Sequence, residues 1–457
     1  MAVFPAAKDQ PPTMNEDIAE LLGRFEQTTA RVGIIGMGYV GLPLAIATLK
    51  AGFRTTGFDV DGAKIEALNS GRSYIKHIPG DTIAEFLRLG DFSATTDFAG
   101  LAAMDAVLIC VPTPLADDRS PDLSYVVSST EAIAAHLRPG QLVILESTTY
   151  PGTTAEVMRP ILEGGGLKSG RDFYLAYSPE REDPGNPAFQ TQTIPKVVGG
   201  DGAQALALAL ALYDKIVVST VPVSSLDTAE AVKLTENIFR SVNIALVNEL
   251  KLVYGKMGID VWEVIEAAKS KPFGFMPFYP GPGLGGHCIP IDPFYLSWRA
   301  RQFGQDTRFI ELAGEINTAM PDHVIAVLEG ALEQRAGVAL ADAKILVLGI
   351  AYKKNVDDTR ESPAFAILER LEARGTETAY YDPHATEIPQ TRDHMALAGR
   401  RSIAWEPAAM GAYDAALIVT DHDDVDYAAL VRECRLVVDS RNATRHVTEG
   451  REKIVMA

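Results

Sequence analysis

The stretch GPGLGGHCIPIDP at residues 281–293 places Cys288 among four glycines and three prolines. Glycine admits backbone angles that other residues avoid, and proline restricts φ, so the loop can hold the thiol in one pose. A thiol held in this way is a candidate nucleophile. His287 could favour its thiolate form, and Asp292 could exchange protons near it. A structural loop with an incidental thiol remains an alternative, whereas the spacing of these side chains does not fit structural zinc, and no metal is predicted.

The other two cysteines have simpler explanations. Cys110 lies inside the apolar run LICVP and Cys434 precedes the run RLVVD, so both are interpreted as small buried core residues. Three cysteines without an even framework or a CxxC pair indicate a reducing compartment, and we expect a cytoplasmic protein.

A second constellation lies near the start of the chain. Gly36, Gly38 and Gly41 form G-x-G-x-x-G, with Tyr39 and Val40 between them, after an apolar run and before a helical stretch. The first glycine permits a tight turn, the second lets backbone approach a pyrophosphate, and the third lets the helix pack on the strand. The negative charge of the ligand would lie at the helix N-terminus.

An acidic residue strengthens this interpretation. Asp59 ends the next predicted strand, where a carboxylate can accept hydrogen bonds from both ribose hydroxyls of NAD. Its charge would repel a 2′-phosphate, which favours NAD over NADP, although Lys64 is close enough in sequence to moderate that repulsion. A glycine turn followed by an ordinary strand-end acid is the alternative.

Two polar residues share a helical face farther along. Lys233 and Asn237 are four residues apart, and an ammonium and an amide placed together can hold a developing oxyanion. Arg240, three residues beyond, could extend the stripe toward a phosphate or a sugar. A solvated helix surface explains the same spacing.

Composition excludes several classes of partner. The 42 basic and 60 acidic residues give a net charge of −18, which repels polyanions and predicts no nucleic-acid partner. The first thirty residues lack a basic start followed by an apolar run, so we expect neither a signal peptide nor a membrane anchor. The most apolar tract, 205–212, is too short for a bilayer and is predicted to be a buried helix.

Apolar runs alternate with helical stretches in two regions of the chain, which predicts an α/β fold with two doubly wound Rossmann-like domains joined by a long central helix. That helix begins near Ser224, where Ser225 or Asp227 would cap it, and Gly255 or Gly258 would end it. The candidate strands lie within FRTTGFDVD, AVLICVP, QLVILES and FYLAYSP in the first region, and within AKILVLGIAYKKN, TETAYYDPH, YDAALIVTDHDD and RLVVDSRN in the second.

Eight motifs follow one another in a familiar order. They are GMGYVG, CVPTP, ESTTYPG, SPEREDPG, AEAVKLTENIFRSVNIALVNE, GPGLGGHCIPIDP, GIAYKKNVDDTRESP and VVDSRN. From about residue 31 to 445 the chain resembles the UDP-glucose/UDP-N-acetylhexosamine 6-dehydrogenase family. SPERxxPG and GGHCIPxDP resemble the branch that acts on N-acetylated sugars, most like the UDP-N-acetylglucosamine 6-dehydrogenases.

The resemblance implies a four-electron oxidation that serves polysaccharide biosynthesis. The C6 hydroxyl of a UDP-sugar becomes a carboxylate while two NAD molecules are reduced. The thiolate of Cys288 would attack the C6 aldehyde, the thiohemiacetal would lose a second hydride, and the resulting thioester would be hydrolysed.

Individual roles follow from the same resemblance. Lys233 and Asn237 would stabilise the alkoxide and thiohemiacetal oxyanions, and Asp292 would transfer protons. Glu180 and Thr148 would position the hydrolytic water, and Thr113 and Thr148 would line the cofactor. The residues matched to substrate contacts are Arg181, Lys233, Asn237, Arg240, Gly285, Tyr352, Lys353, Arg360 and Arg441.

The resemblance also implies the domain plan. We expect an N-terminal extension at 1–30, an NAD-binding domain at 31–222, a central helical linker and dimerisation domain at 223–325, and a C-terminal domain at 326–457 that binds the nucleotide sugar. The partners are then a UDP-sugar and a second copy of the chain, in a homodimer or a higher homo-oligomer, with no membrane. SKPFGFMPFYP differs from shorter versions in the family, so sugar-recognising residues in 269–280 are not assigned.

Other functions stay open. The sugar could be N-acetylgalactosamine, N-acetylmannosamine or glucose instead of N-acetylglucosamine. The chain could also be an acyl transferase with a vestigial dinucleotide fold, or a module that binds NAD or a nucleotide sugar without turnover.

Overall fold

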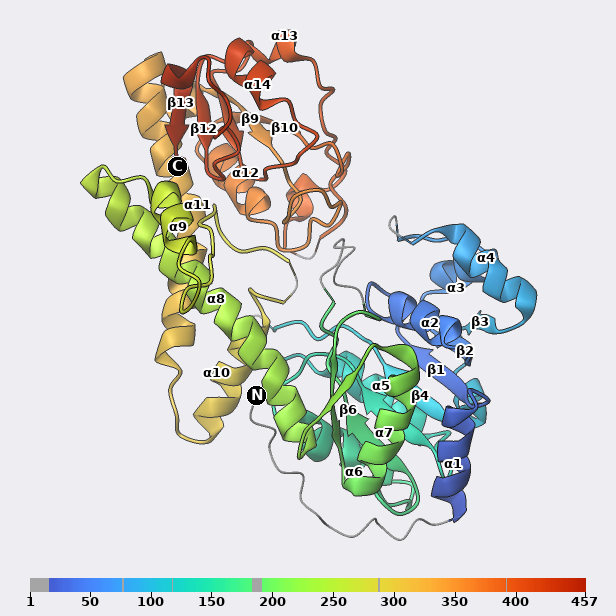
Figure 1. Cartoon of the computed structure of the whole chain (residues 1–457). Coiled ribbons are helices and arrows are strands. Elements are labelled where there is room, and N and C mark those ends of the chain that lie inside the picture. Colours follow the sequence, from blue (N-terminus) through green and yellow to red (C-terminus); the bar gives the residue numbers. More distant parts are fainter. Residues whose placement is uncertain (1–15, 76–77, 117, 183–190, 287, 392) are drawn as a thin grey trace. The chain divides into compact units, whose positions relative to one another are not determined.

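The computed structural model describes residues 16–75, 78–116, 118–182, 191–286, 288–391 and 393–457. The chain divides into two compact units (Figure 1). The first unit extends to Glu236 and includes Trp298–Gly304, and the second unit comprises Asn237–Ser297 and Gln305–Ala457.

The first unit is built on a sheet with the strand order β3-β2-β1-β4-β5-β6-β7-β8. Neighbouring strands are parallel except for β6 and β7, which are antiparallel. The order 3-2-1-4-5-6 is that of a Rossmann fold. The strands are β1 (Arg31–Ile35), β2 (Arg54–Phe58), β3 (Phe92–Thr95), β4 (Ala106–Ile109), β5 (Leu142–Leu145), β6 (Tyr174–Tyr177), β7 (Lys196–Gly200) and β8 (Thr220–Pro222).

Apolar side chains of these strands alternate between two cores. Ile34 and Leu108 pack toward α1 (Glu16–Glu26), α2 (Gly41–Lys50) and α7 (Ala203–Ile216). Val107 and Ile109 belong to the opposite core, with α5 (Ser124–Ala134), α6 (Arg159–Glu163) and the start of α8 (Leu226–Met257). The period of two along a strand places helices on both faces of the sheet. The tract 205–212 lies within α7, which confirms the predicted helix. Two further helices, α3 (Gly62–Asn69) and α4 (Gly80–Leu89), lie along the chain between β2 and β3.

Helix α1 was missed by the sequence analysis. Ile18, Leu21 and Phe25 are buried in the same core as α2 and α7, and the Arg24 guanidinium pairs with Asp105 at 2.6 Å. The spacing of these apolar residues at i, i+3 and i+7 is a helical signal that was available in the sequence.

The second unit carries a parallel sheet with the order β10-β9-β11-β12-β13. One of its faces packs on α11 (Arg308–Ala331) and α12 (Pro363–Ala373), and the other on α13 (Pro407–Met410) and α14 (Tyr427–Glu433). The predicted α/β class with two doubly wound sheets is therefore confirmed. The strands are β9 (Lys344–Leu348), β10 (Glu377–Tyr381), β11 (Ala415–Ile418), β12 (Val437–Asp439) and β13 (Ile454–Met456).

The long helix is α8, and it connects the two sheets along the chain as predicted (Figure 1). Two of the proposed boundary residues lie at its ends. At the start, the Ser225 hydroxyl accepts a hydrogen bond from the Thr228 amide at 3.1 Å, and at the end Gly258 follows the last turn with φ of 72°. Helices α9 (Val261–Lys269) and α10 (Asp292–Gln302) come next in the chain. No helix in the described ranges is long and apolar enough to cross a membrane.

Candidate active site

The glycine loop of the first unit follows β1, and sterics explain its glycines. Gly36 has φ of 89°, and a Cβ on Gly41 would lie 1.8 Å from the carbonyl oxygen of Gly36. A Cβ on Gly38 would meet nothing within 4 Å. The loop is therefore closed where α2 packs and open where a pyrophosphate would approach. Val40 caps α2, and the side chain of Tyr39 is exposed.

Asp59 lies directly after β2 and is buried. Its carboxylate accepts hydrogen bonds from the amides of Met37 at 2.8 Å and Asp61 at 2.9 Å, and the Lys64 ammonium lies 3.4 Å away. A carboxylate offers about four acceptor positions, so one remains for a ribose hydroxyl, and a second is freed when the half-exposed lysine moves. The residues present thus fit the adenosine half of NAD.

The two predicted cofactor-lining threonines meet beside this loop. Thr113 donates to the carbonyl oxygen of Thr148 at 2.8 Å, which joins the turns that follow β4 and β5. A Cβ on Gly36 would lie 2.5 Å from the carbonyl oxygen of Cys110, so the turn after β4 also touches the glycine loop. The carboxyl ends of parallel strands are where such sheets bind ligands.

Glu180 and Lys233 are held together in the first unit. The Lys233 ammonium donates to the backbone carbonyl of Glu180, whose carboxylate Oε1 accepts from the amides of Arg181 and Glu182 at 2.6 Å each. Oε2 of Glu180 is buried and forms no hydrogen bond with any residue that the structure describes. Arg181 pairs with Glu236 at 2.6 Å, a contact that the sequence did not predict.

The thiol loop lies in the second unit. The carbonyl oxygen of half-buried Cys288 accepts from the Asp292 amide at 2.8 Å, so the thiol directly precedes α10. A Cβ on Gly285 would lie 2.6 Å from Cβ of Tyr352, and the Gly286 amide donates to the carbonyl oxygen of Arg360 at 3.0 Å. The loop glycines therefore permit close contact with the segment that carries the predicted substrate residues. His287 lies outside the described residues.

Arg441 and Arg360 have defined partners in the same unit. A Cβ on Gly281 would lie 2.6 Å from the Arg441 guanidinium, which is 3.2 Å from Asp421. Arg360 pairs with Asp358 at 2.6 Å. Lys353 is half-buried in the same segment as Arg360.

Asn237, Arg240 and Asp292 form a hydrogen-bonded chain. The Asn237 amide donates to the Asp292 carboxylate, and Arg240 donates to the Asn237 carbonyl. Asn237 and Asp292 are buried, as is Lys233 in the first unit, whereas Arg240 is exposed. The alternative of a solvated helix surface is therefore wrong for Lys233 and Asn237.

The other two cysteines are buried as predicted. Burial raises the pKa of Cys434 to about 11 and raises that of Cys110 well above its ordinary value. Neither thiol is poised to ionise near neutral pH.

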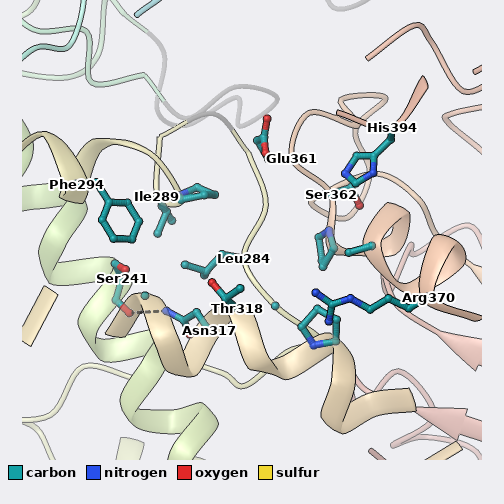
Figure 2. Close-up of a pocket in the computed structure, with 16 residues that line it drawn as sticks. Ser241, Leu284, Ile289, Phe294, Asn317, Thr318, Glu361, Ser362, Arg370 and His394 are labelled. Atoms are coloured by element: carbon teal, nitrogen blue, oxygen red, sulfur yellow. Dashed lines mark hydrogen bonds between the residues drawn. The ribbon is translucent and has the colours of Figure 1, made fainter. Parts of the chain in front are cut away.

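A cavity of about 230 Å³ lies under the thiol loop in the second unit (Figure 2). Leu284 and Ile289, on either side of Cys288, line it together with Asn317 of α11 and Arg370 of α12. Within the described ranges, none of the second unit's predicted substrate contacts lines this cavity, so it is distinct from the predicted nucleotide site.

An open glycine loop with an acid at the end of the next strand defines an NAD-binding domain of the Rossmann class. Comparison with known proteins agrees. The NAD binding domain of the UDP-glucose/GDP-mannose dehydrogenase family matches residues 30–217, its central domain 227–319 and its UDP binding domain 346–446. The chain belongs to this family of NAD-dependent enzymes that oxidise nucleotide sugars.

Relatives match nearly the whole chain. The UDP-N-acetyl-D-mannosamine dehydrogenase of Pyrococcus horikoshii is 36% identical, over 92% of this chain and 97% of its own. The UDP-N-acetyl-D-glucosamine 6-dehydrogenase of Pseudomonas aeruginosa is 34% identical, over 86% and 91%.

Solved structures agree with this assignment. The structure of the UDP-D-ManNAc dehydrogenase of P. horikoshii has a TM-score of 0.83 at 35% identity and covers 93% of this chain and 98% of that one. The NDP-N-acetyl-D-galactosaminuronic acid dehydrogenase of Methanosarcina mazei has a TM-score of 0.77 at 28% identity, over 97% and 98%. The predicted family, enzyme class and cofactor are confirmed.

Proposed function

We propose that the protein oxidises the C6 hydroxyl of a UDP-N-acetylhexosamine, UDP-N-acetylglucosamine in the first instance, to the carboxylate through adducts on Cys288. The observation that carries the proposal is the packing of the thiol loop against the segments bearing Tyr352, Arg360 and Arg441. A sugar whose nucleotide is held by those segments would have its far end near the thiol.

The cofactor unit supplies the redox chemistry. NAD, when bound, accepts hydride from C6, and the open glycine loop with Asp59 would hold its pyrophosphate and ribose. The buried Lys233 ammonium and Asn237 amide would stabilise oxygen anions at C6, a contribution of about 3 kcal/mol for each donor. Asp292, at the first turn of α10, would exchange protons with the reacting oxygen.

Covalent chemistry at Cys288 balances as follows. The thiolate sulfur would bond to the C6 aldehyde carbon, and the adduct would lose its hydroxyl proton to a base and hydride to a second NAD to become a thioester. Water would then displace the thiolate to leave a carboxylic acid. The hydrolytic water would be held by Glu180 and Thr148. The buried Oε2 of Glu180, which forms no hydrogen bond with the described residues, supports this role, since such an atom gains most from a bound water.

An assay of cofactor reduction tests the proposal. The full chain is supplied with NAD and, separately, with UDP-GlcNAc, UDP-ManNAc, UDP-GalNAc or UDP-glucose, and absorbance of the reduced cofactor is followed. About two reduced cofactors for each sugar acid, fastest with UDP-GlcNAc, are expected. Fastest turnover of another UDP-sugar would make that sugar the assigned substrate. Binding of a UDP-sugar without reduction of NAD would favour a non-catalytic module.

The thiol has its own test. Cys288→Ser should lose sugar-acid formation and stall at the aldehyde level, whereas Cys110→Ala, at a buried site, should retain turnover. Wild-type rates of acid formation in Cys288→Ser would remove the thiol from the mechanism.

We also propose a homodimer. Phe239, Leu246 and Val253 are seven residues apart on α8 and are exposed, and Phe309 and Leu312 on α11 are exposed as well. A repeating apolar stripe of this kind favours helix pairing. Leu246→Asp should lower the mass measured by light scattering from dimer to monomer. A monomeric wild-type chain would refute the proposal.

A further inference from the structure

A buried ion cluster lies next to Glu180 in the first unit. The Lys196 ammonium is 2.7 Å from the Glu146 carboxylate, which also accepts a hydrogen bond from the Tyr213 hydroxyl. All three side chains are at least 95% buried. Burial alone would lower the pKa of Lys196, but the carboxylates of Glu146 and Glu180 outweigh it and raise the pKa, so the lysine is charged.

The same ammonium faces the carboxylate oxygen of Glu180 that has no hydrogen-bond partner. Lys196 Nζ lies 3.7 Å from Glu180 Oε2, close enough for an ion pair but too far for a hydrogen bond. The other oxygen of Glu180 is fixed by two backbone amides, and the ammonium also lies 3.4 Å from the Pro179 carbonyl. The two amides therefore fix the orientation of the Glu180 carboxylate through Oε1, and Lys196 balances its charge at Oε2. Oε2 can still accept a hydrogen bond.

We propose that Lys196 is a positioning residue for the hydrolytic step, which balances the charge of the Glu180 carboxylate and keeps it aligned to hold and deprotonate the attacking water. Glu146 and Tyr213 anchor the lysine, because an ammonium in a buried site needs such partners to stay charged and in place. This inference rests on the proposed function, since it assumes that a thioester is hydrolysed.

The step that Lys196 supports is balanced in atoms and charge. The oxygen of water bonds to the C6 carbonyl carbon, and its proton passes to the Glu180 carboxylate. The C6–sulfur bond breaks with its electron pair going to sulfur, and the proton returns to the thiolate or to solvent. Hydrolysis of the thioester involves no oxidation or reduction.

Other charged groups surround the cluster. The titratable side chains that face it are those of Glu146 after β5, Cys110 after β4, Tyr213 on α7 and Lys233 on α8, with the Arg181–Glu236 pair beyond Glu180. Lys233 reaches the Glu180 backbone instead of its carboxylate, so it cannot replace Lys196 at Oε2 without moving.

The test is Lys196→Met in the full chain. We expect both hydride transfers to survive as a burst of two reduced cofactors per active site, followed by steady turnover about 30-fold slower than wild type. Intact-protein mass spectrometry should show an acyl adduct.

Hydroxylamine separates positioning from misfolding. It attacks a thioester without help from a base, so it should restore turnover of Lys196→Met to near the wild-type rate, with a hydroxamate as product. A merely damaged protein would not be rescued.

Three control variants sharpen the result. Glu146→Gln/Lys196→Met removes the pair together and should fold better than Lys196→Met while keeping the burst and the slow hydrolysis. Glu146→Gln alone removes one anchor of Lys196 but leaves its ammonium facing Glu180, so thioester hydrolysis should proceed at a rate between those of the wild type and Lys196→Met. Arg138→Met removes the 2.8 Å ion pair with Asp105 in the same unit. It should lower stability without producing a burst of reduced cofactor.

The outcomes distinguish the two proposals. No cofactor reduction by the wild type with any UDP-sugar would refute the proposed function. Turnover by the wild type together with no burst and no acyl adduct in folded Lys196→Met would overturn the role of Lys196 alone.

Discussion

The two units share a turn and use it differently. In the first unit Gly36 follows β1 with φ of 89°, and its amide donates to the last residue of β2, Phe58, at 2.8 Å. In the second unit Gly349 follows β9 with φ of 84°, and its amide donates to the last residue of β10, Tyr381, at 2.9 Å. An aspartate comes next in both, Asp59 or Asp382.

The two aspartates differ in their remaining capacity to accept hydrogen bonds. Asp382 accepts from four backbone amides, those of Ile350, Ala351, His384 and Ala385, and pairs with His422 at 3.1 Å. These five contacts saturate the roughly four acceptor positions of a carboxylate. Asp59 has two backbone donors and one half-exposed lysine, so it can still receive a ribose.

The connection after the glycine differs as well. Helix α2 begins at Gly41, five residues after Gly36, whereas α12 begins at Pro363, fourteen residues after Gly349. The longer connection carries Tyr352, Lys353 and Arg360. The strand-turn-helix of the NAD-binding unit thus has a counterpart in the other unit whose longer connection carries the predicted substrate contacts.

The largest effect should come from the glycines. Gly41→Ala would place a Cβ 1.8 Å from a backbone oxygen, and we expect NAD affinity to fall by more than about 100-fold, because far smaller overlaps already cost 1–3 kcal/mol. Gly349→Ala, 2.4 Å from Thr420, should destabilise the second unit and leave NAD affinity unchanged. Fluorescence titration with NAD measures both, and loss of NAD binding in Gly349→Ala would contradict the comparison.

Asp382 should make the second unit sensitive to acid. Burial raises the pKa of Asp382, but His422 and the backbone amides together lower it by more than burial raises it. The pKa of Asp382 therefore lies below its ordinary value. Its stabilisation is present above the ordinary aspartate pKa of about 4 and is lost as the pH falls through the folded value. Asp382→Asn should cost about 3–5 kcal/mol at neutral pH and flatten the acid dependence in thermal unfolding. If the stability of Asp382→Asn fell with decreasing pH as steeply as that of the wild type, Asp382 would not be the source of the acid sensitivity.

Glu230 should make the stability of the first unit depend on pH in the opposite sense, with stability falling as the pH rises. It accepts hydrogen bonds from the amides of Gly152 and Thr154 and from the Thr154 hydroxyl, but burial outweighs them and raises its pKa to about 7. Its stabilisation is full below about pH 4 and is lost as the pH rises through 7, a change of roughly 3 kcal/mol. Glu230→Gln should abolish that change in pH-dependent unfolding, and a persisting slope would assign it to other groups.

Lys64 should have the smallest effect. Its pair with Asp59 is half-exposed, so Lys64→Met should change stability by less than about 1 kcal/mol. NAD affinity should change by no more than a few fold, with NADP still bound less tightly because the Asp59 charge remains. Calorimetry with both cofactors tests this, and equal affinities would show that Asp59 does not set the preference.

Much of the fold could be predicted from the sequence because its signals are local. The strands, the glycine loop and helix α8 each follow from spacing within a few residues, and α8 begins one residue after Ser225 and ends one residue before Gly258, two of the residues proposed. The partners of the site residues could not be predicted. The Arg181–Glu236 pair and the approach of Lys196 to Glu180 join residues 55 and 16 positions apart (236 − 181 and 196 − 180).

The sequence by itself determined the α/β class, the cofactor and the identity of the candidate nucleophile, because each depends on residue type at fixed short spacing. Only the tertiary structure decided that Lys233 and Asn237 are buried and that the glycines of the thiol loop serve close contact with Tyr352. It also decided that Asp59 keeps acceptor capacity while Asp382 has none left. Burial and the supply of hydrogen-bond donors are set by segments remote in the chain, and no local pattern records which of them will meet.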